Sequence, residues 1–220
     1  MNTIIYALII LIFMGGCGGN PSPEWTRASF NQLESYKKNY LRGNVPLAEL
    51  SFRKAIEEIK TSGDIRIMEK TYLTKYAVQI ASLETFDDSE YLRLAGVRQR
   101  LEYLNYYYFL KGSFAEVDLR ELPVQYVRVF KASRDGNQRE IDQEMSAIDD
   151  PLSRLVAAGL MVQKDQNSEF ILSVAIQTAS AQGWKKPLLA YLKKLHLYYN
   201  AKGDPKKSAS IQQHIELINE

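Results

Sequence analysis

The amino-acid sequence predicts an all-α fold built from antiparallel helical hairpins. No segment sustains the alternation of apolar and polar residues that marks a half-buried strand, and no Asn-Gly or Asp-Gly pair joins two β-branched runs. Apolar residues recur instead every three or four positions. Prolines stand where such periods begin and glycines where they end, as expected of helix boundaries.

The first four expected helices span residues 25–42, 46–61, 64–84 and 89–111. The first ends at Arg42-Gly43, where a cation complements the helix C-terminus and glycine lets the chain turn. The second begins at Pro46 and carries an apolar stripe formed by Ala48, Phe52, Ala55 and Ile59. The fourth ends at Lys111-Gly112 and carries a stripe formed by Leu94, Val97, Leu101, Leu104 and Tyr108.

The remaining expected helices span residues 123–134, 137–148, 151–163, 168–182, 185–201 and 205–219. Pro123 begins the first of these, and Asp135-Gly136 separates it from the next. Asp150-Pro151 and Asp204-Pro205 each combine a capping carboxylate with a proline at the first helical position. The connections are short, which favours antiparallel neighbours, in either a hairpin array or an irregular bundle.

The N-terminus differs from the rest of the chain. An apolar run of about eleven residues extends from Ile4 to Met14, shorter than the roughly twenty residues of a membrane-spanning helix and within the range of a signal-peptide core. Gly15 and Gly16 follow, and then Cys17, which is the only cysteine. This pattern resembles a bacterial lipoprotein signal with its lipobox, although no Lys or Arg precedes the apolar run. An ordinary secretory or uncleaved N-terminus is the alternative.

The resemblance to a lipoprotein signal implies a cellular location. Residues 1–16 would be a signal peptide, residues 17–24 a lipidated tether and residues 25–220 the helical domain. Cys17 would carry a diacylglyceryl group and an N-acyl chain, which together anchor a protein stably in a membrane. Gly18 follows the cysteine in place of the aspartate that retains such lipoproteins at the inner membrane. We therefore expect a periplasm-facing protein of the outer membrane.

Composition and motifs narrow the function. The formal net charge is +2, with basic and acidic residues interspersed, which predicts no nucleic-acid partner. The two histidines, His196 and His214, fall on different expected helices without metal-site spacing. No nucleophile elbow, phosphate-binding loop or dinucleotide fingerprint is present. We expect no catalytic residues, no metal and no cofactor apart from the lipid on Cys17.

One segment resembles part of a tetratricopeptide repeat. Gly43, Ala48, Phe52 and Ala55 have the spacing of that family's turn glycine, small residue, aromatic residue and alanine. The helix before them matches poorly, and the resemblance covers about a third of the chain. It implies helical hairpins that present a concave surface to a partner polypeptide.

The densest aromatic segment includes Tyr103, Tyr106, Tyr107, Tyr108 and Phe109. Such a segment packs in a core or forms a recognition surface, and Tyr103, Tyr106 and Tyr107 are the residues expected to face outward and bind a partner. The resulting hypothesis is a membrane-anchored adaptor that binds a protein in envelope assembly or secretion. The alternative is a lipoprotein that binds a small ligand or the cell wall in a pocket between helices.

Overall fold

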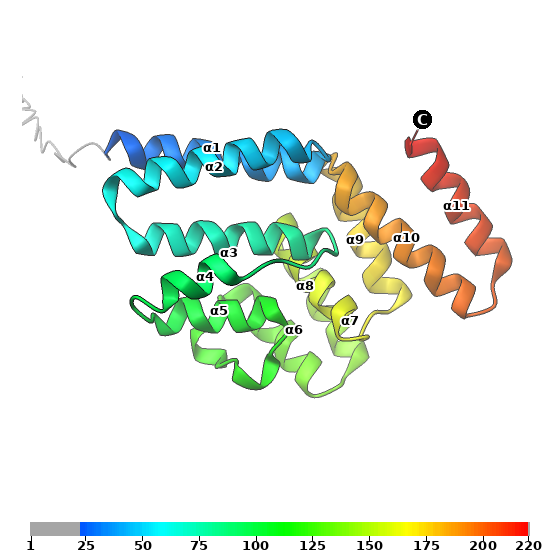
Figure 1. Cartoon of the computed structure of the whole chain (residues 1–220). Coiled ribbons are helices and arrows are strands. Elements are labelled where there is room, and N and C mark those ends of the chain that lie inside the picture. Colours follow the sequence, from blue (N-terminus) through cyan, green and yellow to red (C-terminus); the bar gives the residue numbers. More distant parts are fainter. Residues whose placement is uncertain (1–22, 220) are drawn as a thin grey trace, which may run out of the picture.

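The computed structural model describes residues 23–219, and within that range it is all-α, as the sequence predicts (Figure 1). The signal segment, Cys17 and most of the expected tether lie outside the described residues. None of the described helices has the length and apolar character needed to cross a membrane. Two 3-10 turns, η1 (Phe114–Glu116) and η2 (Leu119–Glu121), accompany the following helices: α1 (Glu24–Arg42), α2 (Val45–Ser62), α3 (Ile65–Ala81), α4 (Ser89–Ala95), α5 (Leu101–Lys111), α6 (Val124–Arg134), α7 (Gln138–Ser146), α8 (Pro151–Gln163), α9 (Glu169–Ala181), α10 (Lys185–Ala201) and α11 (Pro205–Asn219).

The α1–α2 hairpin contains the repeat-like segment. Gly43 ends α1 with a φ of 94°, a conformation that glycine adopts without steric cost. Ala48, Phe52 and Ala55 are all buried. The Phe52 ring packs between Tyr36 of α1 and Tyr72 of α3, with 5.3 Å between ring centroids in each case. Aromatic packing of this kind joins the hairpin to the helix that follows it.

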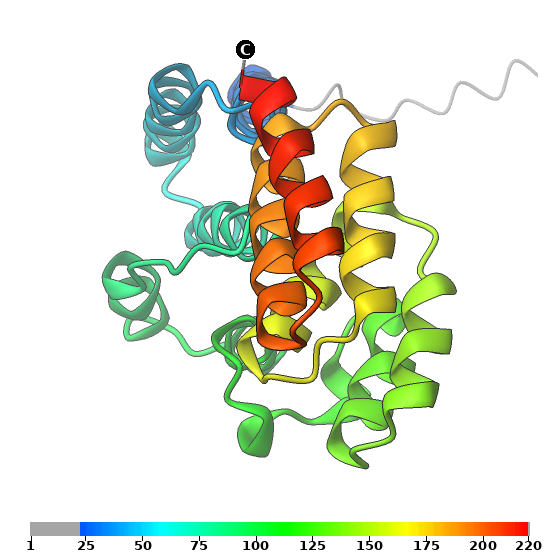
Figure 2. The same cartoon turned by 90° about the vertical axis from the view of Figure 1, so that its right-hand side faces the viewer.

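Helix α3 lies at the centre of the fold, where it contributes to both hydrophobic cores. It crosses α8 at Gly159, and the chain later returns to its beginning, where α10 contacts α1. The Lys186 ammonium pairs with Glu84 at 2.7 Å and lies over the ring of Tyr40. An open array contacts only its sequence neighbours, so these long-range contacts favour the bundle among the two expected arrangements. Figure 2 shows α9, α10 and α11 side by side at the C-terminal end of the chain.

The expected helix at 89–111 is two helices. The chain leaves helical geometry after Ala95, and residues 96–100 form a loop before α5 begins at Leu101. The expected apolar stripe is therefore wrong at this point: Leu94 is buried, but Val97 and Leu101 are 67% and 74% exposed. The cause is tertiary, because Arg100 extends from the loop to form an ion pair with the buried Glu69 of α3.

Other helix boundaries agree with the expected ones within a few residues. Aspartates cap two of the helices as expected from their spacing: Asp150 accepts from the Ser153 N–H at 2.7 Å, and Asp204 accepts from the Lys207 N–H at 3.0 Å. Helix α3 ends at Ala81, before the expected position 84, because Leu83 adopts a φ of 58° that a helix cannot continue.

Candidate partner-binding groove

A groove of about 620 Å³ opens between α3, α5, α6 and the start of α8. We call it the tyrosine groove, because Tyr103 and Tyr106 of α5 and Tyr126 of α6 line it. The four elements come from separate parts of the chain, and Arg120 and Glu121 of η2 also line the groove. In Figure 1 these elements occupy the middle and lower part of the molecule.

The floor of the tyrosine groove is apolar. Leu73 and Ala77 of α3, Leu122 before α6 and Val156 of α8 line it and are held in place by the core behind them. The Tyr106 ring stacks on the Tyr126 ring at a centroid distance of 6.1 Å. Fixed aromatic and aliphatic surfaces of this kind bury contact area with little loss of side-chain entropy.

The hydroxyl groups of Tyr106 and Tyr126 remain neutral. Burial raises the pKa of Tyr106 well above its usual value, and the neighbouring Tyr126 adds to that shift. Burial also raises the pKa of Tyr126. Both hydroxyls therefore keep their protons throughout the physiological pH range, and each can donate or accept a hydrogen bond.

Charges of both signs surround the groove. Lys37, Lys70 and Arg120 line it together with Glu102, Glu121 and Asp150. Arg120 pairs with Asp118 at 2.6 Å and Lys37 pairs with Glu34 at 2.6 Å. The Lys70 ammonium lies 5.3 Å from the centroid of the Tyr103 ring, and within residues 23–219 no carboxylate lies within ion-pair distance of it. Positive and negative charges around the edge of the groove therefore balance, and this rim is neither basic nor acidic.

The three tyrosines expected to face outward differ in position. Tyr103 and Tyr106 are partly exposed and line the groove, but the expectation that Tyr107 faces outward is wrong. Its side chain is buried, its ring stacks on Tyr91 of α4 at 4.9 Å, and its hydroxyl donates to Asp88 at 2.7 Å. Helix α4 covers this side of α5, and the sequence did not indicate α4 as a separate helix.

A serine–histidine contact is another arrangement of interest in the described chain. Residues 23–219 contain no cluster of His, Cys, Asp and Glu that could hold a metal ion. Ser208 Oγ lies 3.0 Å from His196 Nδ1, but the serine is buried and its hydroxyl donates to Asn200 at 2.6 Å. These hydrogen bonds hold α11 against α10.

Comparison with protein-family models, curated proteins and solved structures finds no match for this chain. The sequence did not identify several residues of the groove. Lys70, Leu122 and Val156, for example, belong to separate elements and follow no shared motif. Asp150 was recognisable only as a helix cap. The density of tyrosines was the one signal that pointed to α5.

Proposed function

We propose that this protein is a lipid-anchored helical adaptor of the bacterial cell envelope that binds a segment of a partner polypeptide in the tyrosine groove. The observation that carries the proposal is the groove itself, which is open to solvent, apolar at its floor and lined by Tyr103 and Tyr106. Tyrosine is enriched at the centre of protein interfaces, where its ring supplies area and its hydroxyl supplies directional contacts.

A polypeptide suits this groove better than a polyanion does. Lys37, Lys70 and Arg120 are balanced by Glu102, Glu121 and Asp150, so the rim offers contacts to both charges of a peptide. The floor suits apolar side chains, and the neutral phenols suit backbone carbonyl and amide groups. We propose no catalytic role, no metal and no nucleic-acid partner for this surface.

The anchor belongs to the same proposal. The lipobox resemblance implies a diacylglyceryl and an N-acyl chain on Cys17, and each buried methylene contributes about 0.8 kcal/mol to membrane attachment. Gly18 favours the outer membrane, with the helical domain facing the periplasm. The mechanism is tethering, in which the lipid holds one end of the protein and the helices present the groove. The repeat-like α1–α2 hairpin supports the comparison with tetratricopeptide lipoproteins that act in envelope assembly or secretion.

A small-ligand or cell-wall-binding lipoprotein is the second candidate. The observation that favours it is the size of the groove, since about 620 Å³ lies within the range of small-molecule pockets. Such pockets enclose most of their ligand, however, whereas this groove is open to solvent. The adaptor remains the better fit.

Tyr103→Ser is expected to abolish retention of the partner polypeptide when the native protein is purified from membranes. A central interface aromatic contributes about 2 kcal/mol or more, which is roughly a 30-fold loss of affinity. The melting temperature should change little, because the Tyr103 side chain is only partly buried. Tyr108→Ser is the matched control, since Tyr108 is also partly exposed on α5 but does not line the groove. Equal loss of the partner in both variants would reject the groove as the binding site.

A further inference from the structure

The loop between α4 and α5 exposes large apolar side chains. Val97 is 67% exposed and Leu101, at the start of α5, is 74% exposed, and Leu92 on α4 is 45% exposed. Single exposed apolar residues are ordinary on protein surfaces, but these three lie within ten positions of one another, on α4, in the loop and at the start of α5. Contiguous exposed apolar surface is typical of sites that contact a membrane or another molecule.

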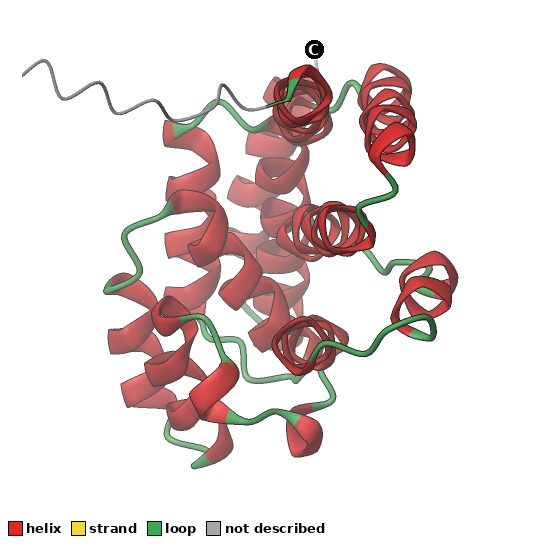
Figure 3. Cartoon of the chain, turned by 90° about the vertical axis from the view of Figure 1, so that its left-hand side faces the viewer, coloured by secondary structure: helices red, strands yellow, loops and turns green. Residues whose placement is uncertain are grey.

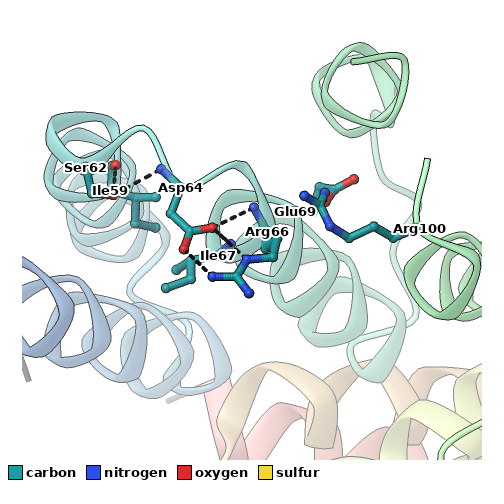
Figure 4. Close-up of polar contacts among 7 residues, drawn as sticks. All are labelled: Ile59, Ser62, Asp64, Arg66, Ile67, Glu69 and Arg100. Carbon is teal, nitrogen blue, oxygen red and sulfur yellow. Dashed lines mark hydrogen bonds and ion pairs between the residues drawn. The ribbon is translucent and has the colours of Figure 1, made fainter. Parts of the chain in front are cut away.

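The loop is held in place by polar contacts. Arg100, its last residue, forms an ion pair with Glu69 of α3, whose side chain is fully buried (Figure 4). At the other end, the Gly96 N–H donates to the Leu92 carbonyl at 3.0 Å. The exposure of Val97 and Leu101 is therefore built into the fold.

The loop lies at the end of the molecule where the described chain begins. Val97, Arg98 and Arg100 line one hollow together with the α2–α3 turn, residues 62–66. Helices α1 and α2 pack antiparallel along their lengths, so the end of α2 is beside the start of α1. Figures 1 and 3 show the start of α1, the α2–α3 turn and the α4–α5 loop on the same side of the molecule.

We infer that this end is a second membrane contact, in which Val97 and Leu101 enter the interfacial region of a phospholipid bilayer and Arg98 binds lipid phosphate. The inference rests on the proposed anchor at Cys17. The six residues from Gly18 to Pro23 reach at most about 20 Å when extended, which keeps this end of the domain near the bilayer surface. Within the described residues no carboxylate lies within ion-pair distance of Arg98, whose guanidinium suits phosphate oxygens.

The consequence is a fixed orientation. A protein held by its lipid alone would rotate freely on its tether, whereas a second contact at the loop sets which surfaces face away from the membrane. Apolar side chains flanked by arginine are the composition that peripheral proteins use to rest at a bilayer interface. The α9–α11 side would then project toward the periplasm.

An environment-sensitive fluorophore on an introduced cysteine tests the inference. The full chain carrying Val97→Cys is purified from bacterial membranes in detergent and reconstituted with vesicles of phosphatidylethanolamine and phosphatidylglycerol, part of which carry a nitroxide. Cys17 is the only native cysteine, and acylation would block its thiol, so the label reports position 97 alone. The control is Leu197→Cys, at a side chain on α10 that is 61% exposed.

We expect a blue shift and nitroxide quenching at position 97 and neither at position 197. Flotation of the protein with the vesicles, but no quenching at position 97, would leave the anchor standing and overturn the loop contact. A blue shift without quenching would show that a second copy or another protein covers the loop, which also overturns it. A protein that fails to float with the vesicles refutes the anchor, and the inference fails with it. Partner retention in the groove is measured separately and is unaffected by these outcomes.

Discussion

Gly159→Ala is expected to destabilise the fold by about 3 kcal/mol, the upper part of the usual cost of overpacking a core. An added Cβ at this position would stand 2.3 Å from the carbonyl oxygen of Ile80 and 3.0 Å from its carbonyl carbon. The nearest of these atoms belong to the backbone of α3, so no side-chain rotation relieves the contact. In a solvent-exposed helix, replacing glycine with alanine would stabilise the fold by about 1 kcal/mol. The close crossing of α3 and α8 therefore turns a stabilising substitution into a destabilising one.

Urea denaturation of Gly159→Ala and Gly96→Ala measures this effect. Gly96 has a φ of −64°, and an added Cβ there would lie 3.4 Å from the Leu92 carbonyl oxygen, an ordinary contact. We expect Gly96→Ala to have the midpoint of the wild type or a slightly higher one. Equal midpoints for the two variants would mean that α3 and α8 do not approach as closely as the structure places them.

Arg100→Ala is expected to cost about 3–5 kcal/mol of folding free energy, because it leaves the Glu69 carboxylate buried without its partner. Glu69 Oε1 already lacks a hydrogen-bond partner within the described residues, so nothing nearby replaces the guanidinium. Replacing both residues, as in Glu69→Met with Arg100→Met, should recover most of the loss, since no buried charge then remains.

The pH dependence of the folding free energy of Arg100→Ala provides a second test of this ion pair. Burial raises the pKa of Glu69, and Arg100 opposes that shift. Since folded Glu69 binds its proton more tightly than unfolded Glu69, protonation favours the fold, and this contribution is lost as pH rises through the folded pKa. Without Arg100, the pKa of Glu69 in the folded protein rises further. The loss of folding free energy in Arg100→Ala should therefore be largest at neutral pH and shrink as pH falls. A loss that does not change with pH would contradict the burial of Glu69.

Most of the helices could be predicted from the sequence because their determinants are local. Asp150 and Pro151 start α8 through a side-chain cap and a fixed φ, and Gly43 ends α1 through its backbone freedom. The break before α5 has a weaker local determinant, because Gly96 is the C-cap residue of α4 but keeps a right-handed φ of −64°. It depends on an ion pair between Arg100 and Glu69, which are 31 positions apart in the chain.

The groove was predictable only in part for the same reason. The tyrosine density identified α5, but the face that each ring presents depends on the neighbouring helices. Tyr103, Tyr106 and Tyr107 share one broad face of α5, and α4 covers Tyr107 through Tyr91 while Tyr106 meets Tyr126 of α6. Periodicity alone cannot assign these partners, because they are set by the packing of separate helices.

Photo-crosslinking in living cells tests the central claim most directly. A benzophenone amino acid replaces Tyr103 in one strain and Tyr108 in another, and both chains are recovered from membranes after irradiation. The adaptor account predicts a covalent polypeptide adduct from position 103, in the tyrosine groove, and none from position 108, outside it. No adduct from position 103, or the same adduct from both positions, would contradict the proposal that the groove holds a partner polypeptide.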